Sequence, residues 1–173
     1  LRVRNIYYWE FQCSGLTVHV ASSAVGAVRV KIGFTRQGDF ISEFRSLAPR
    51  AEFFEDLRPN EALINVIEAY LKGDNPPMNL PWDINATPFR YNVWRCVCKI
   101  PYGETRNYKD IAFMVGSPKG ARAVGQALKK NPLLILIPCH RVVSINGLGG
   151  FGAGIDLKRY LLNLERAGFG NNK

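Results

Sequence analysis

Short apolar runs alternate with turn residues along the first 34 residues of the chain. Three of these runs, at residues 6–11, 16–21 and 25–34, are rich in β-branched and aromatic side chains, and Ser14-Gly15 separates the first two. Runs of this length between turn residues are typical of β-strands. The pattern predicts three strands in an antiparallel meander.

A helical pattern follows the strands. Apolar side chains recur every three or four positions between residues 63 and 71, Asn60 precedes them as a candidate N-cap, and Gly73 follows them as a candidate C-cap. One helix is therefore expected to cover one sheet. No nucleophile, phosphate loop or metal cluster occurs in this half of the sequence, so we predict that it is a structural support.

A stretch rich in proline divides the chain near its middle. Residues 73–82 contain three prolines, and proline cannot continue a helix because it lacks the backbone N–H. We therefore predict an N-terminal α/β support domain at residues 1–75, a linker at residues 76–86 and a C-terminal domain at residues 87–173.

The second half of the sequence has a mainly helical pattern. Helices are predicted at residues 89–99, 108–115, 118–130 and 157–167. Ser117 is the expected cap of the third helix, with Pro118 at its first position, and Asp156 and Gly168 are expected to bound the last one. The short gap between the second and third helices predicts a helix-turn-helix.

The net positive charge of the chain comes entirely from this second half. Residues 1–85 carry 9 Lys and Arg against 10 Asp and Glu, whereas residues 86–173 carry 14 against 4. A solvated basic face without a partner is the ordinary alternative. An asymmetry on the scale of a domain favours a polyanion such as nucleic acid.

Composition also bears on compartment and cofactors. No apolar run approaches the roughly 18 residues of a membrane span, and the N-terminus lacks a signal-peptide pattern, so we expect a cytoplasmic protein without a membrane partner. The four cysteines fit neither a disulfide framework nor paired zinc-ligand spacings, and no metal is expected. Cys96 and Cys98 are interpreted as packing residues, with a redox role as the alternative.

Cys139 is the candidate nucleophile. It follows the apolar stretch at residues 133–137 and precedes His140 and Arg141, which supply a base and a positive field. A thiol attacks as its thiolate, and such neighbours favour that form. The alternative is a packed core cysteine beside a chance histidine.

Arg122 is the candidate DNA-contacting cation. It lies among small residues at the start of the predicted third helix, in the run Ala121-Arg122-Ala123-Val124-Gly125. Small side chains let a helix approach DNA closely, although a packed helix pair with a surface arginine would give the same pattern.

Ordered motifs in the last 85 or so residues resemble the O6-alkylguanine-DNA alkyltransferases, which move alkyl groups from damaged guanine onto their own cysteine. The similar segments are Thr87-Pro88-Phe89, Val93-Trp94, Asn107-Tyr108, Ala121-Arg122-Ala123-Val124-Gly125, Asn131-Pro132, Ile137-Pro138-Cys139-His140-Arg141-Val142-Val143 and Leu161-Leu162-Asn163-Leu164-Glu165. The resemblance implies an α+β protein, with a ribonuclease-H-like α/β domain followed by a mainly helical domain of the winged-helix or helix-turn-helix kind.

The resemblance also implies catalytic roles. Cys139 would accept the alkyl group, His140 would take the thiol proton through a water, and Glu165 would fix the histidine tautomer. Tyr108 would crowd the phosphate of the flipped nucleotide and donate a proton to guanine. The thioether is too stable to hydrolyse, so each molecule would react once, without a cofactor.

The substrate pocket is implied in the same way. Leu128 would form a wall, the main-chain carbonyls of Val142 and the acceptor cysteine would accept the guanine amine, and Asn131 would brace the active-site segment. The loop at Phe151 and Gly152 departs from the family, because it is one residue shorter and Phe151 stands where tyrosine is usual. A glycine-rich loop here suggests room for alkyl groups larger than methyl.

The implied partner is double-stranded DNA that contains O6-alkylguanine, and the implied substrates also include O4-alkylthymine in DNA. Arg122 would fill the stack that the flipped base vacates, while the helix enters the minor groove. The other residues that would line the DNA contact are Ser117, Gly120, Ala121, Ala123, Gly125 and Lys129. The resemblance further implies a prokaryotic monomer that can bind DNA cooperatively.

Two alternatives belong to other functional classes. A non-catalytic lesion sensor would use the helix-turn-helix without the thiol, although members that only sense damage generally lack the acceptor cysteine. A cysteine hydrolase would use Cys139, His140 and Glu165, but it gives no reason for Arg122 or for the basic half of the chain.

Overall fold

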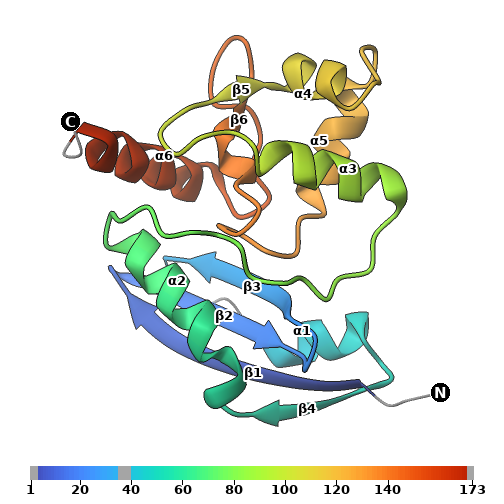
Figure 1. The fold of residues 1–173 in the computed structure, drawn as a ribbon, viewed down its shortest axis with the longest axis vertical. Helices are drawn as coiled ribbons and strands as arrows, with labels where there is room; N and C mark the ends of the chain where they lie inside the picture. Colours follow the sequence, from blue (N-terminus) through green and yellow to red (C-terminus); the bar gives the residue numbers. More distant parts are fainter. Residues whose placement is uncertain (1–3, 35–39, 171–173) are drawn as a thin grey trace. The chain divides into compact units, whose positions relative to one another are not determined.

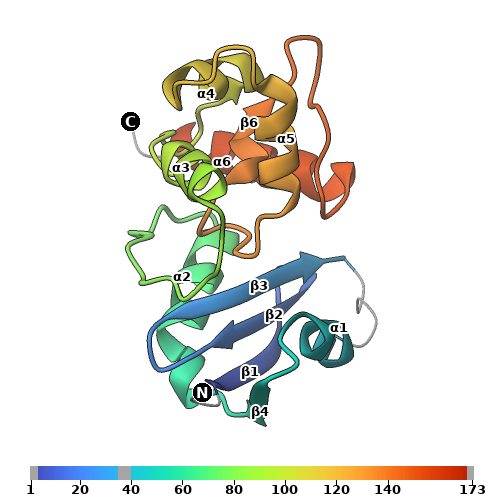
Figure 2. The same ribbon diagram turned by 90° about the vertical axis from the view of Figure 1, so that its right-hand side faces the viewer.

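The computed structural model describes residues 4–34 and 40–170, and the chain forms two compact units (Figures 1 and 2). One unit comprises residues 1–72 and 76–84, and the other comprises residues 73–75 and 85–173. Within the described residues there are one four-stranded sheet, a two-stranded sheet and six α-helices. The mixed α+β class is therefore confirmed, whereas the domain boundaries inferred from the sequence stay a prediction.

The first unit contains the four-stranded sheet. Its strands are β1 (Arg4–Cys13), β2 (Leu16–Ser22), β3 (Ala27–Gly33) and β4 (Ala51–Glu55), in the order β3-β2-β1-β4. The first three pair antiparallel, as the meander predicts. The turn between β1 and β2 places both Ser14 and Gly15 at positive φ, which explains the choice of small turn residues there.

The prediction of a simple meander was incomplete. The helix α1 (Phe40–Leu47) connects the meander to β4, which pairs parallel to β1. Phe40 and Phe44 of α1 pack against Ile6 of β1 and Val28 of β3. Two buried aromatic residues in eight positions are too few to give a clear helical period, so the sequence pattern missed this element.

The predicted helix on the sheet is α2 (Glu61–Leu71), which follows a short 3-10 turn at Arg58–Asn60. It covers one face of the sheet and α1 covers the other (Figures 1 and 2). Asn60 occupies the cap position but its side chain does not cap the helix. Instead its buried amide donates to the carbonyls of Tyr7 and Asp56, at 3.1 and 2.9 Å, so it joins β1 to the start of α2.

The second unit is mainly helical, as predicted. Its elements are α3 (Pro88–Val97), β5 (Arg106–Asn107), α4 (Tyr108–Met114), α5 (Ala121–Lys129), the 3-10 turn η2 (Cys139–Arg141), β6 (Val142–Val143) and α6 (Ile155–Gly170). The indole Nε1 of Trp94 on α3 donates to the carbonyl of Ala127 on α5 at 3.0 Å. Helices α4 and α5 lie on either side of a short turn, which is the arrangement expected for a helix-turn-helix.

Three predicted helix-end residues, Ser117, Asp156 and Gly168, were wrong. The helix α5 begins at Ala121 with Gly120 in the cap position, because residues 117–120 close a turn in which the Gly120 N–H donates to the Ser117 carbonyl at 2.7 Å. The helix α6 begins at Ile155 and runs past Gly168, so Asp156 lies inside its first turn. No helix in the described part of the chain is long and apolar enough to cross a membrane.

Candidate active site

A pair of very short strands brings the candidate nucleophile and Tyr108 together. The strands β5 and β6 pair parallel, with Arg106 opposite Val142 and Asn107 opposite Val143. Cys139 lies in η2, immediately before β6, and Tyr108 begins α4, immediately after β5. A capping box between Asn107 and Asp110 fixes the start of α4. The pairing of β5 with β6 therefore fixes the backbone positions from which the side chains of Cys139 and Tyr108 extend.

Cys139 is a buried thiol with a defined hydrogen-bond donor. Its side chain is 5% exposed, and the Nδ2 of Asn131 lies 3.0 Å from its Sγ. The same Nδ2 donates to the Ile137 carbonyl at 2.9 Å, while Oδ1 accepts from the Leu133 N–H at 2.9 Å. Burial raises the pKa of Cys139 to about 11, against the lowering effects of Asn131 and Lys158. The resting group is thus a thiol that needs a base.

Replacing Asn131 by aspartate should make Cys139 less reactive. The carboxylate keeps the acceptor for Leu133 but puts a negative charge beside Sγ, which disfavours the thiolate. We expect iodoacetamide to alkylate Cys139 about tenfold more slowly at pH 8, because one unit of pKa is a tenfold change in thiolate. Peptide mass spectrometry would report the rate at this cysteine alone. Asn92, exposed on α3, gives the control Asn92→Asp, and equal rates in the two variants would contradict the assignment.

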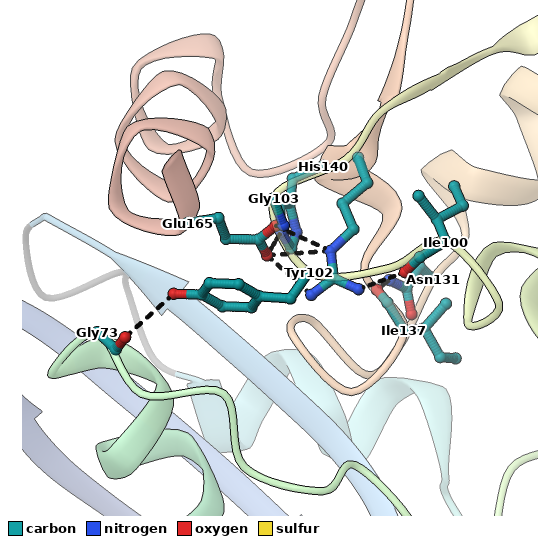
Figure 3. Close-up of polar contacts among 9 residues, drawn as sticks. Gly73, Ile100, Tyr102, Gly103, Asn131, Ile137, His140 and Glu165 are labelled. Carbon is teal, nitrogen blue, oxygen red and sulfur yellow. Dashed lines mark hydrogen bonds and ion pairs between the residues drawn. The ribbon is translucent and has the colours of Figure 1, made fainter. Parts of the chain in front are cut away.

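His140 and Glu165 form a buried pair behind the thiol. Both are 0% exposed, and the Nε2 of His140 lies 2.7 Å from Oε1 of Glu165 (Figure 3). Burial lowers the pKa of His140. Burial alone would raise the pKa of Glu165, but His140 and Arg141 outweigh it and hold this pKa at about 2. An ionised carboxylate accepts from a neutral imidazole, so Nε2 carries the proton and Nδ1 is the basic ring nitrogen.

Arg141 completes the surroundings of Glu165. Its Nε lies 3.0 Å from both carboxylate oxygens and its Nη2 lies 2.9 Å from Oε1, while the Gly103 N–H donates to Oε2 at 2.9 Å. The Arg141 Nη1 donates to the Ile100 carbonyl at 2.7 Å. The order of residues in the sequence predicts that Arg141 supplies the positive field beside Cys139. The structure instead directs this guanidinium to Glu165, and the cation that lowers the pKa of Cys139 is Lys158.

Tyr102 connects this polar cluster to Gly73, three residues before the predicted linker. The guanidinium of Arg141 lies 5.7 Å from the centre of the Tyr102 ring, and the Tyr102 hydroxyl donates to the Gly73 carbonyl at 3.2 Å (Figure 3). Gly168 of α6 passes close by. A Cβ at Gly168 would lie 2.7 Å from the Gly73 carbonyl oxygen and 2.8 Å from the Tyr102 hydroxyl, so only glycine fits without a shift of its neighbours.

A pocket of about 580 Å³ opens at Cys139. It is lined by Tyr108, Ala121, Arg122, Gly125, Leu128, Lys129, Cys139, Gly150, Phe151 and Gly152. All of these except Gly150 were candidate site residues in the sequence. The tyrosine hydroxyl donates to the Gly150 carbonyl at 3.2 Å, and burial raises the pKa of Tyr108, so Tyr108 enters the pocket as a neutral phenol.

The remaining candidates lie outside the pocket lining. Asn131 contacts the Cys139 thiol, and His140 contacts Glu165. None of Asn131, His140 and Glu165 is among the residues that line the pocket. Val142 is buried and its carbonyl accepts from Lys158. The other three candidates, Ser117, Gly120 and Ala123, belong to the turn before α5 or to its first turn and are not among the lining residues.

Sequence reasoning missed Lys158, whose side chain is 0% exposed. The one available signal was its spacing, because Lys158 precedes Leu161, Leu162 and Glu165 by three, four and seven positions and therefore shares the buried face of α6. In the part of the chain that the structure describes, no three side chains come together as a metal site. A cofactor-free reaction stays a prediction.

Known proteins are similar to this chain in sequence and in fold. A family model described as 6-O-methylguanine DNA methyltransferase, DNA binding domain, matches residues 88–167. A Methanosarcina barkeri protein named methylated-DNA–protein-cysteine methyltransferase is 40% identical over 128 residues, which are 73% of this chain and 81% of that protein. The constitutive Bacillus subtilis protein of that name is 47% identical over 105 residues, 60% of this chain and 64% of its own length.

A solved structure extends the likeness over both units. The crystal structure of Mycobacterium tuberculosis OGT in complex with DNA superposes with a TM-score of 0.78 at 31% identity, and the match covers 94% of each chain.

Proposed function

The chain belongs to the methylated-DNA–protein-cysteine methyltransferase family, and from this premise we infer how its own residues carry the reaction. It is a DNA repair protein that transfers an alkyl group from DNA to a cysteine of its own. The acceptor is Cys139. One observation carries this assignment: Cys139 is the cysteine among the lining residues of the pocket, and the next residue in the chain, His140, forms a buried pair with Glu165.

The thiol must lose its proton before it can attack. A pKa of about 11 leaves little thiolate at neutral pH, and the basic Nδ1 of His140 takes the proton through a water molecule. Glu165 already accepts the Nε2 proton and stabilises the imidazolium that forms, as the acid does in a catalytic triad. The sulfur then forms a bond to the alkyl carbon as the bond from that carbon to O6 breaks.

The electron pair of the broken bond stays on guanine, which needs a proton. Tyr108 supplies it, because its hydroxyl lies at the pocket wall and burial keeps it protonated until the alkyl group leaves, and the tyrosinate then regains a proton from water. A neutral guanine leaves more readily than its anion. The thioether on Cys139 does not hydrolyse, so each molecule reacts once.

The substrate base must leave the DNA stack to reach the pocket. Unstacking costs a few kcal/mol, and Arg122, exposed at the start of α5, offsets this by filling the vacated space. Leu128 and Phe151 form walls beside the base, and Gly152, which also lines the pocket, donates its backbone N–H to guanine O6. The main-chain carbonyls of Cys139, which lines the pocket, and of Val142, with the lone pair that Lys158 does not use, accept from the guanine amine.

We propose that α5 enters the minor groove of double-stranded DNA. The small residues Ala121, Ala123 and Gly125 bring the backbone close, and Ser117, Gly120 and Lys129 contact the phosphates. The substrate range includes O4-alkylthymine and alkyl groups larger than methyl, for which the 580 Å³ pocket leaves room. The protein acts as a monomer that can bind DNA cooperatively in a prokaryotic cytoplasm.

We also propose a more specific fold for each of the two units. The order β3-β2-β1-β4, with β4 parallel to β1 and a helix on each face, supports a ribonuclease-H-like first unit. The sequence of α4, a short turn and α5 supports the winged-helix or helix-turn-helix description of the second.

Intact-mass spectrometry after mixing with duplex DNA that contains one O6-methylguanine tests the assignment. We expect a gain of one methyl group per molecule, which peptide mapping places on Cys139 and which an unmodified duplex does not produce. Tight binding to the lesion without a change in mass would indicate a sensor instead. Mass gain on another cysteine would refute Cys139 as the acceptor.

A further inference from the structure

Lys158 is a buried ammonium group in the wall of the site. It stands in the first turns of α6 with its side chain 0% exposed. No carboxylate forms an ion pair with it among residues 4–34 and 40–170. Burying an unpaired charge costs stability unless neighbouring dipoles replace its hydration. The side chain therefore needs a reason to be there that packing does not provide.

The contacts of Lys158 all lead to the pocket. Its Nζ donates to the Val142 carbonyl at 2.6 Å, just after the acceptor turn, and to the Gly150 carbonyl at 3.2 Å, in the glycine-rich loop. It also lies 6.0 and 5.9 Å from the ring centres of Tyr108 and Phe151. One side chain thus connects α6, the acceptor segment, the loop and the start of α4.

We propose that Lys158 is a positioning residue of the alkyl-transfer site, which ties the loop at Gly150 to the acceptor segment at Val142 and places its charge where the Cys139 thiolate forms. The proposal rests on the proposed function of Cys139. It assigns Lys158 two effects, one on the geometry of the pocket wall and one on the ionisation of the thiol.

The first effect follows from the Gly150 carbonyl. This oxygen accepts from both Lys158 and Tyr108. Lys158 and Tyr108, the proposed proton donor, therefore bind the loop at the same residue. The neighbouring Phe151 and Gly152 line the pocket. Without the ammonium, the loop loses one of these two side-chain anchors, and the wall that confronts the substrate base is less well fixed.

The second effect follows from charge. The titratable groups that face Lys158 are Cys139 and His140 in η2 and Tyr108 in α4. A cation next to Cys139 favours the thiolate, and the pKa values of the two groups respond to each other in the expected directions. The same cation disfavours the imidazolium form of His140, so the ring is neutral in the resting site and the imidazolium depends on Glu165 for its stabilisation.

The test compares Lys158→Met, which removes charge and donors, with Lys158→Gln, which keeps N–H donors without charge. Arg159→Met is the matched control, because it removes one exposed positive charge from the adjacent position of α6. Each protein is assayed for single-turnover methyl transfer at saturating lesion DNA, for lesion affinity, and for the pH dependence of iodoacetamide alkylation at Cys139 without DNA.

We expect Lys158→Met to transfer methyl at least about tenfold more slowly, with its Cys139 alkylation profile moved to higher pH by about one unit. Lesion affinity should stay within about threefold of wild type, which is less than half a tenfold step. Lys158→Gln should show the same shifted profile with a smaller loss of transfer. Arg159→Met should keep both the wild-type rate and the wild-type profile.

Other outcomes would overturn the proposal. An unchanged rate and profile in Lys158→Met would mean that the lysine has no part in transfer, while methylation of wild-type Cys139 would leave the proposed function standing. Loss of lesion affinity in parallel with rate, or failure of Lys158→Gln to fold, would identify Lys158 as a packing residue. Absence of methyl on wild-type Cys139 would instead refute the proposed function itself.

Discussion

Replacement of Cys139 by serine is expected to abolish alkyl transfer and to leave lesion binding intact. Serine keeps the shape of the site and can still accept from Asn131, which now contacts Sγ at 3.0 Å. An alcohol ionises far less readily than a thiol and is a much weaker nucleophile toward an alkyl carbon. Transfer should fall below detection in a single-turnover assay, while the affinity for duplex DNA that contains O6-methylguanine should change by less than about threefold.

Cys98→Ser is the matched control for this substitution. Cys98 is another free cysteine of the same unit, and its Sγ contacts the Leu136 carbonyl rather than the pocket. Although the residue is exposed at the surface, the surroundings of its Sγ raise its pKa to about 12 through loss of hydration, so little of it is thiolate. Cys98→Ser should transfer at the wild-type rate. Residual transfer in Cys139→Ser that disappears in the double variant would show that Cys98 is a second acceptor.

Replacement of Glu165 by glutamine should slow transfer roughly 100-fold or more, the usual range for loss of acid–base assistance. The amide does not stabilise the imidazolium of His140 as a carboxylate does. The structure adds an effect on stability, because Glu165 also accepts from Arg141 and Gly103. Leaving the buried guanidinium without its carboxylate should cost about 3–5 kcal/mol in the free energy of unfolding. Urea denaturation would measure this cost.

The pH dependence of stability separates the two effects of Glu165. Its pKa is about 2 in the folded protein against an ordinary value of 4.5, so its contribution is complete above pH 4.5 and is lost as the pH falls toward 2. Glu165→Gln should lack this part of the acid dependence. Glu104→Gln is the control, since Glu104 pairs with Arg106 at the surface. If Glu165→Gln loses stability but transfers at the wild-type rate, the residue is structural only.

The local sequence identified the reactive residues of this site more readily than the residues that hold them in position. Cys139 and His140 are neighbours in the chain, and the helical pattern of residues 108–115 placed Tyr108 at a helix start, so these residues could be found without a structure. The contact between His140 and Glu165 spans 25 positions. It could be named only through the family resemblance, because a glutamate on a helix is usually solvated.

The sequence pattern failed to predict Lys158 and the strand β4 for physical reasons. A lysine on the apolar face of α6 is normally interpreted as a boundary residue, since a buried ammonium is rare without a carboxylate partner. Lys158 is an exception because its ammonium group donates to two carbonyls and lies near two aromatic rings. The strand β4 is five residues long with one aromatic pair, which is too short for a period, and its parallel pairing depends on α1 rather than on its own sequence.

Gly168 has a consequence for where the chain can be divided. Its missing side chain makes room for the Gly73 carbonyl, which Tyr102 binds beside Arg141. By these contacts residues 73–75 belong with the helical unit, although they precede the prolines that suggest a boundary. A cut at Thr87, where the sequence places the domain start, would remove a piece of that unit. The chain alternates between the two units from residue 72 to residue 85, so an excised helical unit would have to keep Gly73 with the alkyl acceptor.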